Sequence, residues 1–106
     1  MLQCEVLASQ DNLNRDVQNV VASDGMSEIL AYARSGELMI TGLTNIQSIR
    51  TADIAGVNAV VYCRGKRPDE KVIEFANCKE IPVFTTKMVM FDICAILYNA
   101  GLRGIS

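Results

Sequence analysis

The chain has 106 residues, of which 50% are hydrophobic and 21% are charged, and its formal net charge is −2. A chain of this length can build one substantial core, so we predict a single domain over residues 1–106. The small negative net charge argues against binding to nucleic acid or to an anionic membrane surface.

The N-terminal sequence lacks the basic region and apolar stretch that mark a signal peptide. The most apolar stretch covers residues 88–98, and it is too short to cross a bilayer, which takes about 20 residues. We therefore predict a soluble, cytoplasmic protein.

The chain contains four cysteines and no histidine. No two cysteines have the spacing of a Cys-x-x-Cys pair, so the sequence predicts neither a metal site nor a cofactor. Each lies in or beside an apolar run, which favours four reduced thiols in the core. They are Cys4, Cys63, Cys78 and Cys94.

The first elements alternate between strand and helix patterns. Residues 2–8 alternate as a half-buried strand does, with Leu7 on the outer side. A strand over 17–22, a short helix over 27–33 and a strand over 38–40 follow.

Next comes a helix whose apolar stripe consists of Ile46, Ile49, Ala52 and Ile54, with Gly56 at its end. The run from Ala59 to Cys63 is almost continuously apolar, which is typical of a strand in the middle of a parallel sheet.

The C-terminal part predicts two helices separated by a strand over 82–85. Pro68 suits the first turn of the first helix, which has Val72, Ile73 and Ala76 on its inner face. Thr86 is the predicted cap of the last helix, over 88–99.

This order predicts an α/β fold with a largely parallel sheet of about five strands and flanking helices, because helical crossovers join parallel neighbours. The two N-terminal strands could form an antiparallel edge. The carboxyl edge of such a sheet is where ligands bind.

Small, polar or basic residues follow the strands at that predicted edge. A glycine allows a ligand to approach the backbone, hydroxyls can hydrogen-bond it, and basic side chains can neutralise a phosphate or carboxylate. We therefore predict a site for a nucleotide or phosphorylated metabolite. Its residues are Thr41, Gly42, Thr44, Asn45, Arg64, Gly65, Lys66, Thr85 and Thr86.

A purely structural alternative explains the same residues. Thr44 and Thr86 would then cap helices, and Arg64 and Arg67 would keep a loop soluble. The orientation of Arg64 and Lys66 separates the two interpretations: a sensor needs them over the sheet edge, whereas a module that binds only a protein can direct them outward.

Several segments together carry a family resemblance that covers nearly the whole chain. They are Thr41-Gly42-Leu43-Thr44-Asn45, Ile49-Arg50-Thr51-Ala52, Arg64-Gly65-Lys66-Arg67-Pro68, Ile81-Pro82-Val83, Thr85-Thr86 and Met90-Phe91. The chain resembles the DRTGG-domain family, small α/β domains related to the N-terminal domain of HPr kinase/phosphorylase. The name-giving motif has the form Asn14-Arg15-Asp16-Val17-Gln18-Asn19, which keeps the arginine but not Thr-Gly-Gly. The resemblance implies a regulatory role and no kinase activity.

The residues themselves predict no catalytic apparatus. Gly65-Lys66 lacks the upstream glycine of a phosphate-binding loop, and the absence of histidine rules out a Ser-His-Asp or Cys-His arrangement. A small transferase or phosphatase would need a pair of metal-binding carboxylates, for which Asp24 with Asp53 or Asp92 is the candidate.

The predicted helix over Met88–Asn99 is apolar nearly all round, with Asp92 in its first turn. In so small a domain its second apolar side could face another subunit, which predicts a homodimer through this helix. The alternative is that the N-terminal strands bury the helix within the monomer.

Overall fold

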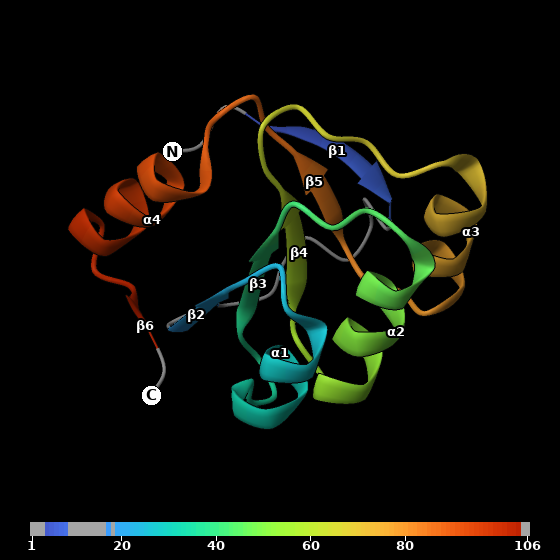
Figure 1. Cartoon of the computed structure of the whole chain (residues 1–106), viewed down its shortest axis with the longest axis horizontal. Helices are drawn as coiled ribbons and strands as arrows, with labels where there is room; N and C mark the ends of the chain where they lie inside the picture. Colours follow the sequence, from blue (N-terminus) through green and yellow to red (C-terminus); the bar gives the residue numbers. More distant parts are fainter. Residues whose placement is uncertain (1–3, 9–16, 18, 105–106) are drawn as a thin grey trace.

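The computed structural model describes residues 4–8, 17 and 19–104, which form a mixed α/β fold (Figure 1). The strands are β1 (Glu5–Ala8), β2 (Asn19–Ala22), β3 (Leu38–Thr41), β4 (Ala59–Tyr62), β5 (Val83–Thr85) and β6 (Arg103–Gly104). The helices are α1 (Met26–Tyr32), α2 (Ile46–Ala55), α3 (Glu70–Cys78) and α4 (Met90–Asn99).

The described strands form one sheet with the order β1-β5-β4-β3-β2-β6. All neighbouring strands are parallel except β1, which runs antiparallel to β5. The predicted α/β fold with a largely parallel sheet is therefore confirmed. Strands β3 and β4 are buried at every residue, as expected for the middle of such a sheet.

The described sheet has six strands where about five were predicted, because the two-residue strand β6 returns beside β2. One detail of the predicted sheet is wrong. Only β1 forms an antiparallel edge, since β2 pairs in parallel with β3. The order of the strands depends on which edges the crossovers reach, and short apolar runs do not encode this.

The helices divide between the two faces of the sheet. Figure 1 shows α1, α2 and α3 together on one side of the sheet and α4 on the other. On the three-helix side, Val60 and Tyr62 of β4 pack with Ile49 of α2. On the α4 side, Val61 of β4 packs with Ile93. Alternate residues of one buried strand thus supply both cores.

Strand β1 departs from strict alternation. Its pairing with β5 shifts register between Val6 and Ala8, and Leu7 packs against the three-helix core instead of lying on the outer side. A bulge inserts one residue into the strand and reorients the side chains beyond it.

The helix starts also differ from the prediction. Helix α3 begins at Glu70, and the Asp69 carboxylate caps it by accepting a hydrogen bond of 3.1 Å from the Val72 amide. Pro68 therefore lies before the cap and not in the first turn. Helix α4 begins after Val89, so Thr86 does not cap it.

Some predicted core residues lie at the surface. Ile49 and Ala52 of α2 are buried as predicted, but Ile54 is 72% exposed. Ile46 is also exposed. Among the cysteines, all of which are free thiols, Cys63 is buried and Cys78 is exposed, so the prediction of four core thiols is wrong for Cys78.

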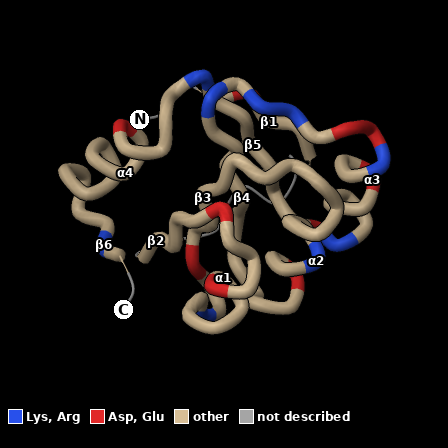
Figure 2. The backbone as a smooth tube through the Cα atoms, viewed as in Figure 1, with Lys and Arg blue, Asp and Glu red and all other residues tan. Residues whose placement is uncertain are grey.

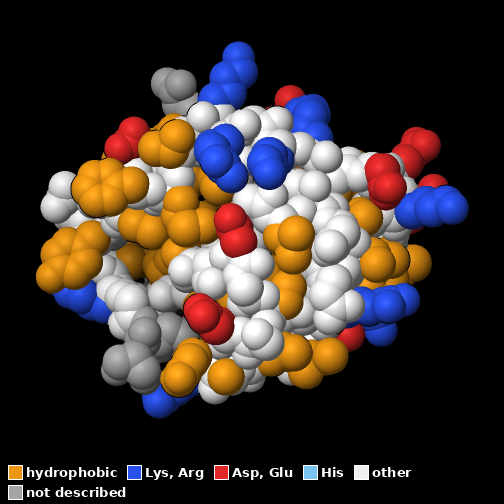
Figure 3. Space-filling view, in the orientation of Figure 1, with side chains coloured by type: hydrophobic (Ala, Val, Ile, Leu, Met, Phe, Trp, Pro, Cys, Tyr) orange, Lys and Arg blue, Asp and Glu red, His pale blue; other side chains and the backbone are white. Residues whose placement is uncertain are grey.

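Helix α4 buries only one of its two apolar sides. Ile93 and Leu97 face the sheet, whereas Phe91 is 81% exposed and Tyr98 is 59% exposed. Figure 3 shows hydrophobic side chains gathered over α4. Within the described part of the chain, no helix combines the length and apolarity that a membrane span needs.

Candidate functional site

The carboxyl ends of the parallel strands β2, β3, β4 and β5 lie at one edge of the sheet, as predicted. The loops that leave this edge begin near Ser23, Gly42, Arg64 and Lys87. Figure 2 shows basic residues on the loop between β4 and α3 and acidic residues at the start of α1. The edge therefore brings opposite charges together.

Asp24 links the first two of these loops. Its Oδ1 accepts a hydrogen bond of 2.6 Å from the Gly42 amide and one of 3.2 Å from the Thr41 hydroxyl. The Thr41 hydroxyl also accepts a bond of 3.1 Å from the Leu43 amide. Thr41 is fully buried, so its hydroxyl orders the loop and is not open to a ligand.

The predicted binding residues did not include Asp24. The available signal was its position: Asp24 lies two residues beyond β2, at the same edge where Thr41 ends β3 and Gly42 follows it. Asp24 and Gly42 are 18 positions apart, so the sequence alone does not show that the carboxylate lies within hydrogen-bonding distance of the amide.

Arg64 lies over Gly42. A Cβ placed on Gly42 would lie 3.4 Å from Arg64 Nη2 and 3.3 Å from Asp24 Oδ1. The guanidinium and the carboxylate therefore flank the space that a side chain at position 42 would occupy. The backbone of Arg64 has a φ of 58°, a left-handed conformation that is uncommon for a residue with a side chain. Such conformations cluster at functional sites.

The Arg64 side chain is not used for an internal ion pair. Within the described residues, the ion pairs join Arg67 to Glu5 and Lys79 to Asp53. The exposed Arg64 guanidinium takes part in neither, so it is available to an anion from solution.

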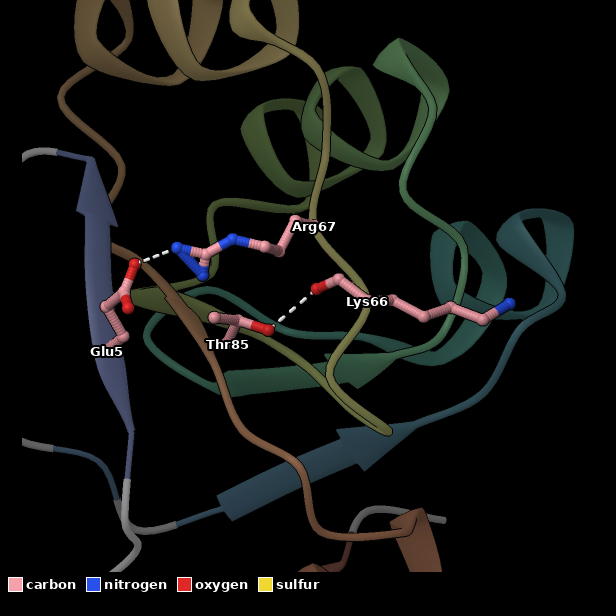
Figure 4. Close-up of polar contacts among 4 residues, drawn as sticks. All are labelled: Glu5, Lys66, Arg67 and Thr85. Carbon is pink, nitrogen blue, oxygen red and sulfur yellow. Dashed lines mark hydrogen bonds and ion pairs between the residues drawn. The ribbon is translucent and has the colours of Figure 1, made fainter.

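The loop between β4 and α3 is tied to the loop that precedes α4. The Arg64 amide donates to the Met88 carbonyl at 2.8 Å, and the Gly65 amide donates to the Thr86 carbonyl at 2.7 Å. The Thr85 hydroxyl donates to the Lys66 carbonyl at 2.6 Å (Figure 4). The Gly65 amide, the Thr86 carbonyl and the Thr85 hydroxyl therefore position the loop. Their hydrogen bonds leave them unavailable to a ligand.

The two basic side chains after Gly65 diverge. Figure 4 shows Arg67 directed toward Glu5 of β1, with which it forms an ion pair, and Lys66 extending away from Thr85. Of the two residues chosen to separate the interpretations, Arg64 lies over the sheet edge and Lys66 is exposed to solvent.

Thr44 and Asn45 lie at the start of α2. Asn45 occupies the N-cap position, but no side chain caps this helix. The Asn45 carbonyl accepts bonds from the Ser48 amide at 3.0 Å and the Ser48 hydroxyl at 2.7 Å. The structural alternative, in which Thr44 caps α2 and Thr86 caps α4, is therefore wrong for both threonines.

A hollow with a volume of about 460 Å³ opens beside the predicted site. It contains Thr85 and Thr86 together with Arg67 and Lys87. The Arg67 side chain there is engaged with Glu5. The predicted residues are thus divided between this hollow and the Arg64 side of the loop.

The carboxylates considered for catalysis come from different elements, and Asp24 is engaged by Gly42 and Thr41. Asp53 lies in the last turn of α2 and pairs with Lys79 at 3.5 Å, whereas Asp92 lies in the first turn of α4 on the other face. No group of three or more potential metal ligands occurs among the described residues.

Two thiols have a raised pKa. Burial raises the pKa of Cys4, partly opposed by its hydrogen bond with Thr86. Burial, reinforced by the neighbouring Cys63, raises the pKa of Cys94. A raised pKa lowers the thiolate fraction at neutral pH, so neither thiol is activated as a nucleophile.

The parallel sheet, the crossover helices and the polar carboxyl edge define a small α/β domain of the type that holds ligands at that edge. The family profile of the DRTGG domain matches residues 1–100, and the chain belongs to this family. Residues 14–16 and 18 of the predicted name-giving motif lie outside the described residues.

A solved structure with the same fold is the CBS and DRTGG domains of the regulatory region of Clostridium perfringens pyrophosphatase, complexed with its activator, diadenosine tetraphosphate. The TM-score is 0.74 at 21% sequence identity, over 89% of this chain and 41% of that one. The present chain therefore spans less than half of that protein chain. No match was found among curated proteins.

Proposed function

We propose that this chain is a non-catalytic regulatory module that senses a nucleotide or phosphorylated metabolite at the carboxyl edge of its sheet. The observation that carries the proposal is the position of the Arg64 guanidinium over Gly42. A phosphate can approach the backbone there because Gly42 has no side chain, and a guanidinium binds phosphate oxygens in a bidentate manner.

The charges near this edge favour an anionic ligand. Arg64 and Lys66 contribute two positive charges near this edge, and Asp24 contributes one negative charge. Asp24 is already engaged by Gly42 and Thr41, which disperses its charge into two hydrogen bonds. The Arg64 guanidinium lies beside Gly42, where its Nη2 is 3.4 Å from the position that a Cβ on Gly42 would occupy.

The comparison supports the class of function. The pyrophosphatase places its DRTGG domain in a regulatory region, and that region is complexed with a nucleotide activator.

A thermal-shift screen tests the proposal, with ATP, ADP, AMP, inorganic pyrophosphate and acetyl phosphate as probes. A ligand at 100 times its Kd stabilises the native state by about 2.7 kcal/mol, which corresponds to a clear rise in Tm for a domain of this size. Arg64→Ala should abolish the rise produced by inorganic pyrophosphate and acetyl phosphate, the two probes that carry no purine base. The matched control is Arg50→Ala, which removes the same charge from an exposed position on α2.

Two results would contradict the proposal. One is that no probe raises Tm in a concentration-dependent way. The other is that Arg64→Ala and Arg50→Ala respond to the probes as the wild type does.

A second candidate function is homodimerisation through α4, for which the exposed apolar side of this helix is the supporting observation. Phe91 is 81% exposed on α4, and burying such side chains is a main driving force of association. Sedimentation equilibrium should show a dimer that Phe91→Glu dissociates. The control Ile54→Glu alters an exposed apolar residue on α2 and should leave the dimer intact. A wild-type monomer at high micromolar concentration would exclude this function.

A further inference from the structure

A groove separate from the Arg64 site lies between α1 and α4, beside the edge of the sheet formed by β2 and β6. Its volume is about 390 Å³, within the range of about 300–1,000 Å³ that is typical of small-molecule sites. Val20 and Val21 of β2 line it, together with Ile29 of α1 and Leu97 of α4. Helices α1 and α4 lie on opposite faces of the sheet, and residues of both line the groove.

Tyrosines from the two helices line this groove. Tyr32 comes from α1 and is 62% exposed, and Tyr98 comes from α4 and is 59% exposed. The guanidinium of Arg103 lies 4.1 Å from the centroid of the Tyr98 ring. Arg103 is held there by hydrogen bonds from its Nη1 to the carbonyls of Tyr98 and Leu102, at 3.1 Å and 2.8 Å. This contact fixes the orientation of one aromatic wall.

The groove also contains a carboxylate without a strong partner. Glu28 lines it, and the partner identified for its side chain is the Ser23 hydroxyl at 3.5 Å, a weak contact. Glu28 takes part in neither of the ion pairs of the described residues. A ligand in the groove would therefore meet the tyrosine rings, the Arg103 guanidinium that lies over the Tyr98 ring, and a negatively charged hydrogen-bond acceptor.

We propose that this groove binds a planar aromatic heterocycle that carries an amino group, as a purine base does. The ring would stack against the tyrosines, because every such base has a π-face, and its amino group would donate to Glu28. The binding determinant is the base and not a phosphate. The site is thus chemically distinct from the Arg64 site, and the proposal does not depend on the sensing function.

Titration of adenosine, followed by NMR of the tyrosine rings, tests this proposal. The chain has three tyrosines, and Tyr62 is fully buried in the core, so it serves as an internal control. Saturable shifts are expected for Tyr32 and Tyr98 and not for Tyr62. Tyr98→Leu should weaken binding about tenfold or more. Phe91→Leu, an exposed aromatic residue of α4 outside the groove, should leave the affinity unchanged.

Purine riboside, which lacks the amino group, should bind several times more weakly than adenosine to the wild type. Glu28→Ala should remove that difference. Equal affinities of the two nucleosides for the wild type would overturn the role given to Glu28.

The whole proposal would be overturned by either of two results. One is the absence of saturable tyrosine shifts at millimolar adenosine. The other is an affinity that neither Tyr32→Leu nor Tyr98→Leu changes. Because adenosine has no phosphate, and Arg64→Ala should not alter its binding, these results are independent of those that test the sensing function.

Discussion

Ser48 of α2 and Tyr62 of β4 form a pair of hydroxyls, and its contacts predict how stability changes when one hydroxyl, the other, or both are removed. The two oxygens are 2.6 Å apart, and both residues are fully buried. Ser48 has a further partner, since its hydroxyl donates to the Asn45 carbonyl at 2.7 Å. Ser48 is the partner identified for the Tyr62 hydroxyl. Removing one or the other member therefore has unequal consequences.

Tyr62→Phe removes one hydrogen bond and leaves the Ser48 hydroxyl satisfied, so it should cost about 1 kcal/mol of the free energy of unfolding. Ser48→Ala leaves the Tyr62 hydroxyl buried without its partner, which costs about 1–3 kcal/mol, offset by about 0.5 kcal/mol from the better helix propensity of alanine. The double variant removes both polar groups. It should therefore be more stable than Ser48→Ala alone.

Urea denaturation followed by far-UV circular dichroism measures all four proteins, with unchanged m values as the check that only stability has altered. The coupling energy of the double-mutant cycle should be at least about 0.5 kcal/mol. The reasoning would be refuted if the double variant were no more stable than Ser48→Ala, or if the effects of the two substitutions were additive.

Three further predictions follow from other contacts. Burial raises the pKa of Tyr62, partly opposed by Ser48, so the unfolded chain loses the phenol proton first. This difference in pKa contributes stability that is complete below about pH 10 and is lost as the pH rises further. Tyr62→Phe should reduce this alkaline loss of the free energy of unfolding, which urea denaturation at a series of alkaline pH values measures. Asp69→Ala removes the cap of α3 and should cost about 0.5–2 kcal/mol, seen as a Tm lowered by about 4–8 °C for each kcal/mol. Gly42→Ala should change stability by less than about 1 kcal/mol, because the chain-entropy gain opposes a tight contact with Asp24, yet its methyl group should abolish the probe-induced rise in Tm.

The sequence predicted the sheet correctly where the hydrophobic pattern of a segment matches the burial that the fold imposes on it. The apolar run from Ala59 to Cys63 identified the buried central strand β4, because only a strand covered on both faces is apolar at consecutive positions. The same alternation of strands and helices placed Thr41, Gly42 and Arg64 at one edge, since parallel strands share the direction in which they end.

The sequence did not predict the use of each side chain at that edge. Thr41, Thr85 and Thr86 are residue types expected in a binding site, but hydrogen bonds within and between the loops occupy their hydroxyls. Whether a hydroxyl faces a loop or a ligand depends on distances of a few ångströms across strands that are far apart in sequence. Arg64 combines a position over Gly42 with a charged group that takes part in neither ion pair of the described residues.

The groove between α1 and α4 could not be predicted for a related reason. It depends on β6 pairing beside β2 and on α4 lying on the opposite face from α1. A two-residue strand such as β6 carries no periodic signal. The tyrosines that line the groove are separated by 66 positions, from Tyr32 to Tyr98.

The central claim, that an anion binds over Gly42 through Arg64, is tested most directly by amide NMR shifts during a titration with inorganic pyrophosphate. The account predicts saturable shifts that centre on the amides of Gly42, Leu43 and Gly65 and that disappear in Arg64→Ala. It would be contradicted if these amides did not respond, or if they responded equally in the Arg64→Ala variant.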